Sequence, residues 1–448
     1  MVSTSAVLQA IVGTAGLEDE RERRVFSQVT WRLVPFMFLC YVIAYIDRIN
    51  IGFAKASLLA DLGLSTATYG RGAGLFFIGY CFFEIPSNLI LERVGARIWI
   101  ARIMIGWGLV SMAMVLVTGT ASFYALRILL GIAEAGFFPG MVLYLTYWIP
   151  ARQRAKTGAL FMTAIPIAMI VGPWISEELL KLDGRTFLGW TFQGWQWLFL
   201  VEGIPAVLAG IFALYWLTDR PEKATWLAPE DRQWLSEEMS RERAQRVKRH
   251  GHGMGSLLNP KVLVLCVFYF LNNMATYGVF FFLPTILEEA SGYKGWRLAA
   301  ITSFPFAIAL VGMVLIGRHS DQTGERKGHV AACAITAAAG ILLATQFPNS
   351  VAMIVISFAL SQLGQRAILG PFWAIPPMFL GGAAAAAGIA SINAVGNLGG
   401  FFGPDLMGRL RDSSSGYSLG LTVLATGLIV EALLVLSLKL PKDDEARA

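Results

Sequence analysis

Stretches of about 20 apolar residues alternate with short polar segments along most of the chain. A helix needs this length to cross the roughly 30 Å hydrocarbon layer of a bilayer. Runs such as 332–343 and 419–430 lack the strict alternation of a transmembrane barrel strand, which favours helices. The pattern predicts twelve crossings, at residues 33–54, 69–90, 98–117, 121–148, 157–175, 197–217, 261–287, 298–317, 330–347, 351–380, 383–408 and 417–438.

Composition supports a membrane protein and excludes several other classes. Of the 448 residues, 56% are hydrophobic and only 15% are charged, whereas soluble domains carry roughly 25% charged residues. A soluble globular enzyme, a disordered chain and a nucleic-acid binder are therefore excluded. We expect an all-α, multi-pass protein of the inner (plasma) membrane.

The basic residues set the expected orientation. If the N-terminus lies inside, the inner segments hold 25 Lys and Arg residues and the outer segments hold eight, Lys55 among them. Because cytoplasmic loops are enriched in Lys and Arg, both termini are predicted to be cytoplasmic. The net charge of +6 follows from this bias and implies no nucleic-acid partner.

Targeting and metal signals are weak in this sequence. The first 30 residues are polar, so no cleavable signal peptide is expected. The four cysteines lie in apolar segments and the four histidines in loops, which predicts no disulfide, no metal site and no cofactor. An integral membrane enzyme is disfavoured because no nucleophile with an adjacent base is visible.

The chain divides into two similar halves. Residues 219–259 carry fifteen charged side chains and separate six crossings from six; a short surface helix is expected near Pro229–Val247, followed by a basic, glycine-rich piece. The loop acids Glu92 and Asp321 are 229 residues apart, and the Gly-Pro pairs at 172 and 403 are 231 apart. Such duplication predicts a site between the halves near the midplane.

The expected divisions are an N-terminal cytoplasmic tail (1–27), an N-terminal six-helix half (28–217), a cytoplasmic linker (218–259), a C-terminal six-helix half (260–440) and a cytoplasmic tail (441–448).

Several motifs resemble those of a known family. The loops Glu92–Arg97 and Asp321–Arg326 resemble the loop motif of the major facilitator superfamily, and Arg127–Gly131 resembles its fourth-helix motif. The signature of its anion:cation symporter family is similar to the segments Asp47–Ala54, Gly79–Tyr80 with Pro86–Asn88, Glu134–Gly140, Pro371–Pro376 and Ile392–Gly400. The resemblance spans about residues 28–438 and implies twelve helices in two pseudo-symmetric six-helix bundles.

The resemblance also implies a function. Members of that family are similar to one another in moving organic anions, in bacteria usually with protons. We expect a secondary active transporter, not an enzyme, that imports a small organic anion with protons by alternating access. A hydroxy-dicarboxylate such as tartrate, or a sugar acid, is the expected substrate. Aromatic carboxylate symport, neutral-solute facilitation and drug–proton antiport are the alternatives, and three intramembrane arginines argue against the last two.

Burying an ionisable side chain inside the bilayer costs free energy, so such residues usually have a functional or structural role. Guanidinium groups are always charged and bind carboxylates in a bidentate manner, so Arg48 and Arg127 are predicted to bind substrate. Protonation of a buried carboxyl depends on burial and on nearby arginine, so Asp47 and Glu134 are predicted to carry protons. The resemblance carries over all four positions. The alternative is a static salt-bridge network that orients the first and fourth crossings.

Arg366 lies in the middle of the tenth crossing and is not part of the family pattern. It is either a second anchor for a substrate with two carboxylates or the partner of Glu431 in a structural ion pair. Glu84 and Glu202 are expected to have structural roles.

Polar and aromatic residues complete the expected cavity, because buried amides in lipid need hydrogen-bond partners. These further substrate-binding candidates are Tyr45, Tyr80, Asn273, Tyr277, Trp373 and Asn393. Aromatic residues could equally serve to pack helices.

The loop motifs are predicted to form a cytoplasmic gate that stabilises the outward-facing state, the alternative being solvated turns. Its members are Glu92, Arg93, Arg97, Asp321 and Arg326. The expected partners are a small organic anion, protons and the lipid bilayer, and the protein is expected to work as a monomer.

Overall fold

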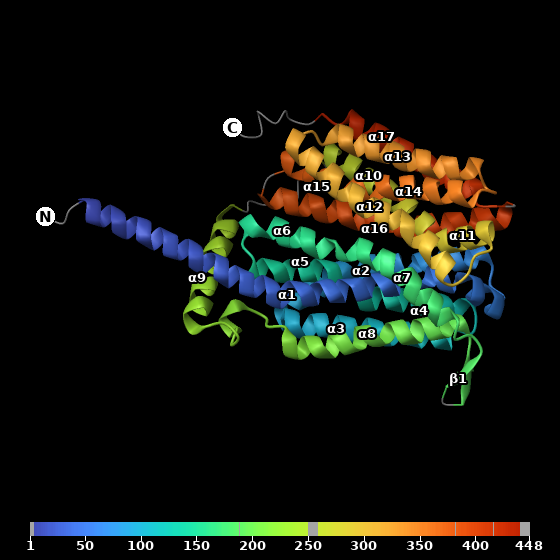
Figure 1. Ribbon diagram of the computed structural model, residues 1–448, viewed down its shortest axis with the longest axis horizontal. Coiled ribbons are helices and arrows are strands. Elements are labelled where there is room, and N and C mark those ends of the chain that lie inside the picture. Colours follow the sequence, from blue (N-terminus) through green and yellow to red (C-terminus); the bar gives the residue numbers. More distant parts are fainter. Residues whose placement is uncertain (1–3, 188, 250–258, 381, 415, 440–448) are drawn as a thin grey trace.

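The computed structural model describes residues 4–187, 189–249, 259–380, 382–414 and 416–439, and it is almost entirely helical (Figure 1). Among these residues, eleven helical segments are long and apolar enough to cross a membrane. The predicted eleventh crossing corresponds to α16 (Gly382–Ser413), which packs against α10 and α2. The predicted fold of two helical bundles is confirmed.

In the described part of the chain, the helices of each half form six long segments, some of them built from two consecutive helices. The N-terminal half comprises α1 (Thr4–Leu62), α2 (Thr66–Val94), α3 (Ala96–Ala113) with the 3₁₀ turn η1 (Met114–Leu116), α4 (Thr120–Glu134), α5 (Phe137–Trp148), α6 (Ala151–Met162), α7 (Ala164–Leu180) and α8 (Gly194–Trp216). The C-terminal half comprises α10 (Pro260–Phe280), α11 (Leu283–Ser291), α12 (Trp296–Thr323), α13 (Lys327–Gln346), α14 (Val351–Ala367), α15 (Leu369–Ala374), the 3₁₀ turn η4 (Pro376–Met378), α16 and α17 (Ser418–Ser437).

The segment between the halves forms the predicted surface helix. After the 3₁₀ turn η2 (Pro221–Lys223), α9 (Pro229–Arg249) crosses one end of the bundle (Figure 1). Asp231 of α9 accepts hydrogen bonds from Arg21 (3.1 Å) and Arg24 (2.9 Å) of α1. Residues 4–27, expected to be a tail, continue α1. The glycine-rich piece 250–258 and the C-terminal tail 441–448 lie outside the described residues.

At the other end, a short antiparallel hairpin follows α7. It pairs β1 (Arg185–Phe187) with β2 (Trp190–Phe192). We refer below to the α9 end and the hairpin end of the bundle (Figure 1).

The fourth crossing bends where α4 meets α5. Gly136 at this junction has a φ of +83°, a left-handed conformation that a side chain would disfavour. This junction follows directly after Glu134, the last residue of α4.

The two halves meet mainly through α2 with α16 and through α7 with α12. A Cβ on Gly70 of α2 would lie 2.2 Å from the carbonyl oxygen of Pro404 in α16, so only glycine allows this approach. The Tyr69 hydroxyl lies 2.9 Å from two carbonyl oxygens, those of Ile51 in α1 and Phe281 at the C-terminus of α10. These contacts join the halves toward the hairpin end.

Candidate functional site

A buried ion pair joins α1 to α4 inside the N-terminal half. Arg48 donates a hydrogen bond to Glu134, and their side chains are only 10% and 2% exposed. The two residues are 86 positions apart in the sequence. Because an unpaired buried charge is costly, each of these two side chains stabilises the other in its charged form.

Aromatic rings surround the Arg48 guanidinium. Its central carbon lies 5.0 Å from the ring of Tyr45, 5.2 Å from that of Phe76 and 5.7 Å from that of Tyr80. Contacts at these distances stabilise a cation electrostatically, most strongly away from water. Tyr45 and Tyr80, predicted as cavity residues, therefore lie at the pair.

Asp47 occupies a different environment from its neighbour Arg48. Its carboxylate accepts hydrogen bonds from Ser111 of α3 and from Asn50, the latter at 3.2 Å, and its Oδ2 atom is buried without a partner. Consecutive helical residues point in different directions, which explains why Asp47 does not neutralise Arg48.

Arg127 binds backbone rather than a carboxylate. Its guanidinium donates to the carbonyl oxygens of Gly72 (3.3 Å) and Ala73 (3.1 Å) in α2, while Nη1 is buried with no partner. The close packing of α4 on α2 depends on Gly131, where a Cβ would lie 2.0 Å from the carbonyl oxygen of Phe76. Arg127 thus positions α2 and keeps one free guanidinium nitrogen.

The C-terminal half places an aromatic group opposite this pair. The ring of Tyr277 in α10 lies 4.3 Å from that of Phe77 in α2, between centroids. The ring of Tyr269 lies 5.0 Å from that of Trp373, between centroids, and Asn273 is nearby. Of the predicted cavity residues, Tyr277 therefore lies at the junction of the halves, and Trp373 and Asn273 gather around Tyr269.

Arg366 does not pair with Glu431 among the described residues. Glu431, fully buried, accepts a hydrogen bond from Asn272 at 3.0 Å instead. Arg366 has a buried Nε with no partner and is close enough to interact electrostatically with Tyr269 and Tyr277. Among the described residues, the structural ion pair considered from the sequence is therefore not formed.

Glu84 links the halves, a role that the sequence analysis missed. Asn393 and Asn397 of α16 donate to its two carboxylate oxygens at 3.1 and 3.4 Å. Glu84 follows Tyr80 by four residues and so shares its face of α2, a signal that could have identified it. Glu84, expected to have only a structural role, therefore contacts Asn393, a predicted substrate-binding residue.

Glu202 of α8 adds a further carboxyl beside Asp47. It accepts a hydrogen bond from Ser176 at 3.0 Å, and its Oε2 is buried without a partner. Asn50 donates to Asp47 at 3.2 Å and lies near Glu202. Helical periodicity could not place α8 against α1, so no sequence signal identified this neighbourhood.

The predicted gate residues bond within their own loop or to the linker. Arg326 donates to Asp321 at 2.6 Å, and the backbone N–H of Arg97 donates to Asp219 at 2.9 Å. Glu92 and Arg93 are exposed. In the part of the chain that the structure describes, no hydrogen bond or ion pair joins the two loops.

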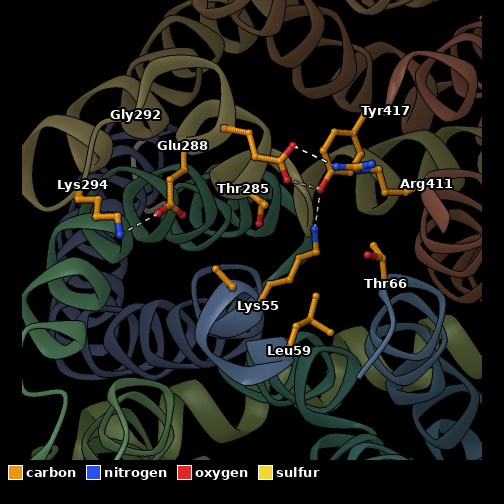
Figure 2. A pocket seen from close by; sticks show the side chains of 11 residues that line it. Lys55, Leu59, Thr66, Thr285, Glu288, Gly292, Lys294, Arg411 and Tyr417 are labelled. Carbon is orange, nitrogen blue, oxygen red and sulfur yellow. Dashed lines mark hydrogen bonds and ion pairs between the residues drawn. The ribbon is translucent and has the colours of Figure 1, made fainter. Parts of the chain in front are cut away.

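A cavity of about 410 Å³ opens between the halves at the hairpin end (Figure 2). Lys55, counted from the sequence among the outer-segment residues, extends from α1 into this region and is only 2% exposed. It lies seven residues after Arg48, on the same face of α1. Among the described residues, no group of His, Cys, Asp and Glu side chains is arranged to hold a metal ion.

Comparisons with known proteins agree with this architecture. The sequence pattern of the Major Facilitator Superfamily matches residues 37–404. The chain is 46% identical to a "Putative tartrate transporter" of Agrobacterium vitis, over 95% of this chain and 98% of that protein. It is 40% identical to a quinolone resistance transporter of Acinetobacter baumannii, over 90% and 92% of the two chains. An inward open structure of the xylose transporter XylE from E. coli superposes with a TM-score of 0.74 at 16% identity, covering 93% of this chain and 98% of that one.

Proposed function

The chain belongs to the major facilitator superfamily and is a multi-pass membrane transporter, not an enzyme; on that premise, we propose that it imports a small organic anion together with protons. The observation that carries this proposal is the buried Arg48–Glu134 pair, with Asp47 beside it. A fixed positive charge in the bundle suits an anionic substrate and disfavours neutral or cationic ones.

Coupling follows from competition for Arg48. While Glu134 is ionised, its carboxylate occupies the guanidinium. Protonation of Glu134 removes that partner and leaves Arg48 free to bind a substrate carboxylate in a bidentate manner. Release of the substrate restores the ion pair and expels the proton, so each transport cycle moves both species together. Asp47, with its partnerless Oδ2, is the second proton carrier.

A hydroxy-dicarboxylate such as tartrate is the substrate we propose. Arg48 binds one carboxylate, assisted by the free Nη1 of Arg127, and Arg366 binds the other from the opposite half. Tyr277, Trp373, Asn273 and Asn393 bind the hydroxyl groups and shape the space between. The tartrate name of a relative 46% identical to this chain supports the same substrate class.

Transport proceeds by alternating access, with the halves rocking about the site. We place the α9 end in the cytoplasm, since the inner segments hold most of the Lys and Arg residues. Contacts between α2 and α16 then close the outer side. When the halves rock the other way, the loop residues Glu92, Arg93, Arg97, Asp321 and Arg326 meet across the cytoplasmic side.

Uptake into proteoliposomes tests the proposal. Purified protein is assayed with radiolabelled tartrate, a sugar acid, an aromatic acid, xylose and a quinolone, with and without an inward proton gradient. Accumulation of one of the acids that depends on the gradient supports proton-coupled anion import. Gradient-independent equilibration of xylose, or proton-driven export of the quinolone, would replace the proposal with facilitation or drug antiport.

A further inference from the structure

The cavity at the hairpin end is bounded by both halves. Lys55 and Thr66 come from the N-terminal half, and Thr285, Glu288, Arg411 and Tyr417 from the C-terminal half (Figure 2). The cavity is therefore a place where relative movement of the halves changes the surroundings of individual side chains.

The Lys55 ammonium has no carboxylate partner in this cavity. Its Nζ donates to the Tyr417 hydroxyl at 2.7 Å and lies 4.6 Å from the ring centroid of Phe282. The rings of Tyr417 and Tyr69 are 5.1 and 5.7 Å away. Aromatic rings and one phenol oxygen offset only part of the cost of burying an ammonium group.

The other charged groups that line the cavity are already paired. Lys294 pairs with Glu288 at 3.8 Å, and Arg411 pairs with Glu289 at 3.5 Å. Glu289 reaches Lys55 only through the Tyr417 hydroxyl, which donates to it at 3.2 Å. The lining therefore holds three cations against two carboxylates, and among these residues Lys55 is the cation without a carboxylate partner.

We propose that Lys55 is an anion-binding group of an outer vestibule: Tyr417 and Phe282 cap its ammonium while the halves are in contact there, and a carboxylate of the incoming substrate binds it once they separate. This inference rests on the proposed import of an organic anion. Separation of the halves removes the two caps contributed by the C-terminal half and leaves the ammonium on α1 beside Tyr69. Water and a substrate carboxylate then have access to it.

The position of Lys55 suits a first binding step. Seven residues correspond to about 10 Å along a helix, so Lys55 and Arg48 stand about two turns apart on one face of α1. Thr66 and Thr285 place two hydroxyl groups at the same cavity. An anion can pass from the vestibule to the central guanidinium while remaining near positive charge, which raises its local concentration.

Three variants test this assignment through the KM and Vmax of proton-driven tartrate uptake. Lys55→Gln removes the charge at similar length and should raise KM about tenfold, the value of a single charge-assisted contact in a hydrated site. Lys55→Arg keeps the charge and should stay within about threefold of wild type. Lys294→Gln is the matched control, since that lysine lines the same cavity but is already paired, and its KM should not change.

Ionic strength separates an anion site from a purely structural role. Screening weakens exposed charge interactions, so the wild-type KM should rise with salt and the KM of Lys55→Gln should rise less. Chloride and phosphate are compared as the added anions; competition by either at equal ionic strength would reassign the vestibule to inorganic anions.

A Lys55→Gln protein with wild-type KM and altered Vmax would overturn the proposal and leave Lys55 as a closing contact only. Size-exclusion chromatography of each purified variant controls for misfolding, with Lys55→Arg as the variant expected to fold in every case. Failure of the proposed function is distinguishable, because the wild-type protein would then accumulate none of the acids.

Discussion

Replacement of Glu134 by Gln isolates the coupling step. Gln is nearly isosteric with a protonated Glu, so Glu134→Gln holds the site permanently in the state that leaves Arg48 available to substrate. We expect the variant to bind the anion at every pH and to lose the accumulation that is driven by protonation of Glu134.

The structure sets the size of the effect. The Arg48–Glu134 hydrogen bond lies between side chains that are 10% and 2% exposed, and a hydrogen bond to a charged group contributes about 1.5–3 kcal/mol. Ionised Glu134 should therefore weaken substrate binding by a factor of roughly 10 to 150. The wild-type Kd should rise by up to that factor as pH increases, whereas the Kd of Glu134→Gln should stay flat.

Two measurements check this expectation. Calorimetric titration of purified protein with tartrate at several pH values gives the pH dependence of Kd. Uptake into proteoliposomes with the membrane voltage clamped at zero gives the accumulation ratio; one coupled proton supports about tenfold accumulation per pH unit. Glu431→Gln is a matched control, since this buried carboxyl contacts Asn272 and no arginine in the ion pairs described.

A Kd of Glu134→Gln that keeps the wild-type dependence on pH would refute the competition for Arg48. Full accumulation by the variant together with a flat Kd would refute Glu134 as the coupling residue and assign coupling to Asp47 alone. Loss of binding at all pH values would instead mean that the Glu134 carboxylate is required to hold Arg48 in place.

Three further predictions concern the framework of the site. Gly131→Ala should lower the free energy of unfolding by about 1–3 kcal/mol because its Cβ would overlap a backbone carbonyl of α2. Gly106→Ala is the control in the same thermal unfolding assay: its Cβ would meet nothing within 4 Å, so the change should stabilise the protein by up to about 1 kcal/mol. Arg127→Lys should lose the two-point donation to the α2 carbonyls, which needs two separate guanidinium nitrogens, and should destabilise the protein by about 1–3 kcal/mol. Equal melting temperatures would contradict the role of Arg127 in positioning α2. Arg366→Gln should raise the KM about tenfold for a dicarboxylate and little for a monocarboxylate. The control Glu431→Gln should leave the KM of both substrates unchanged. Equal effects of Arg366→Gln on the two substrates would show that Arg366 does not bind the second carboxylate.

The sequence alone determined the membrane class, the predicted crossings and the two matching halves, because hydrophobic length and spacing are local properties of the chain. It also identified Asp47, Arg48, Arg127 and Glu134 as exceptional, since charge inside an apolar run is visible without any structure. Seven residues separate Arg127 from Glu134, so helical periodicity places both side chains on one face of the fourth crossing.

Only the tertiary structure decided how these charges are partnered. Arg48 binds Glu134 while Arg127 binds backbone carbonyls, Glu84 meets Asn393 across the halves, and Lys55 is buried where charge counting placed an outer-segment residue. Periodicity fixes the face on which a side chain lies, but its partner depends on the rotation, depth and neighbours of each helix. Those are set by packing between segments far apart in the chain, such as the glycine-mediated approach of α2 to α4 and α16.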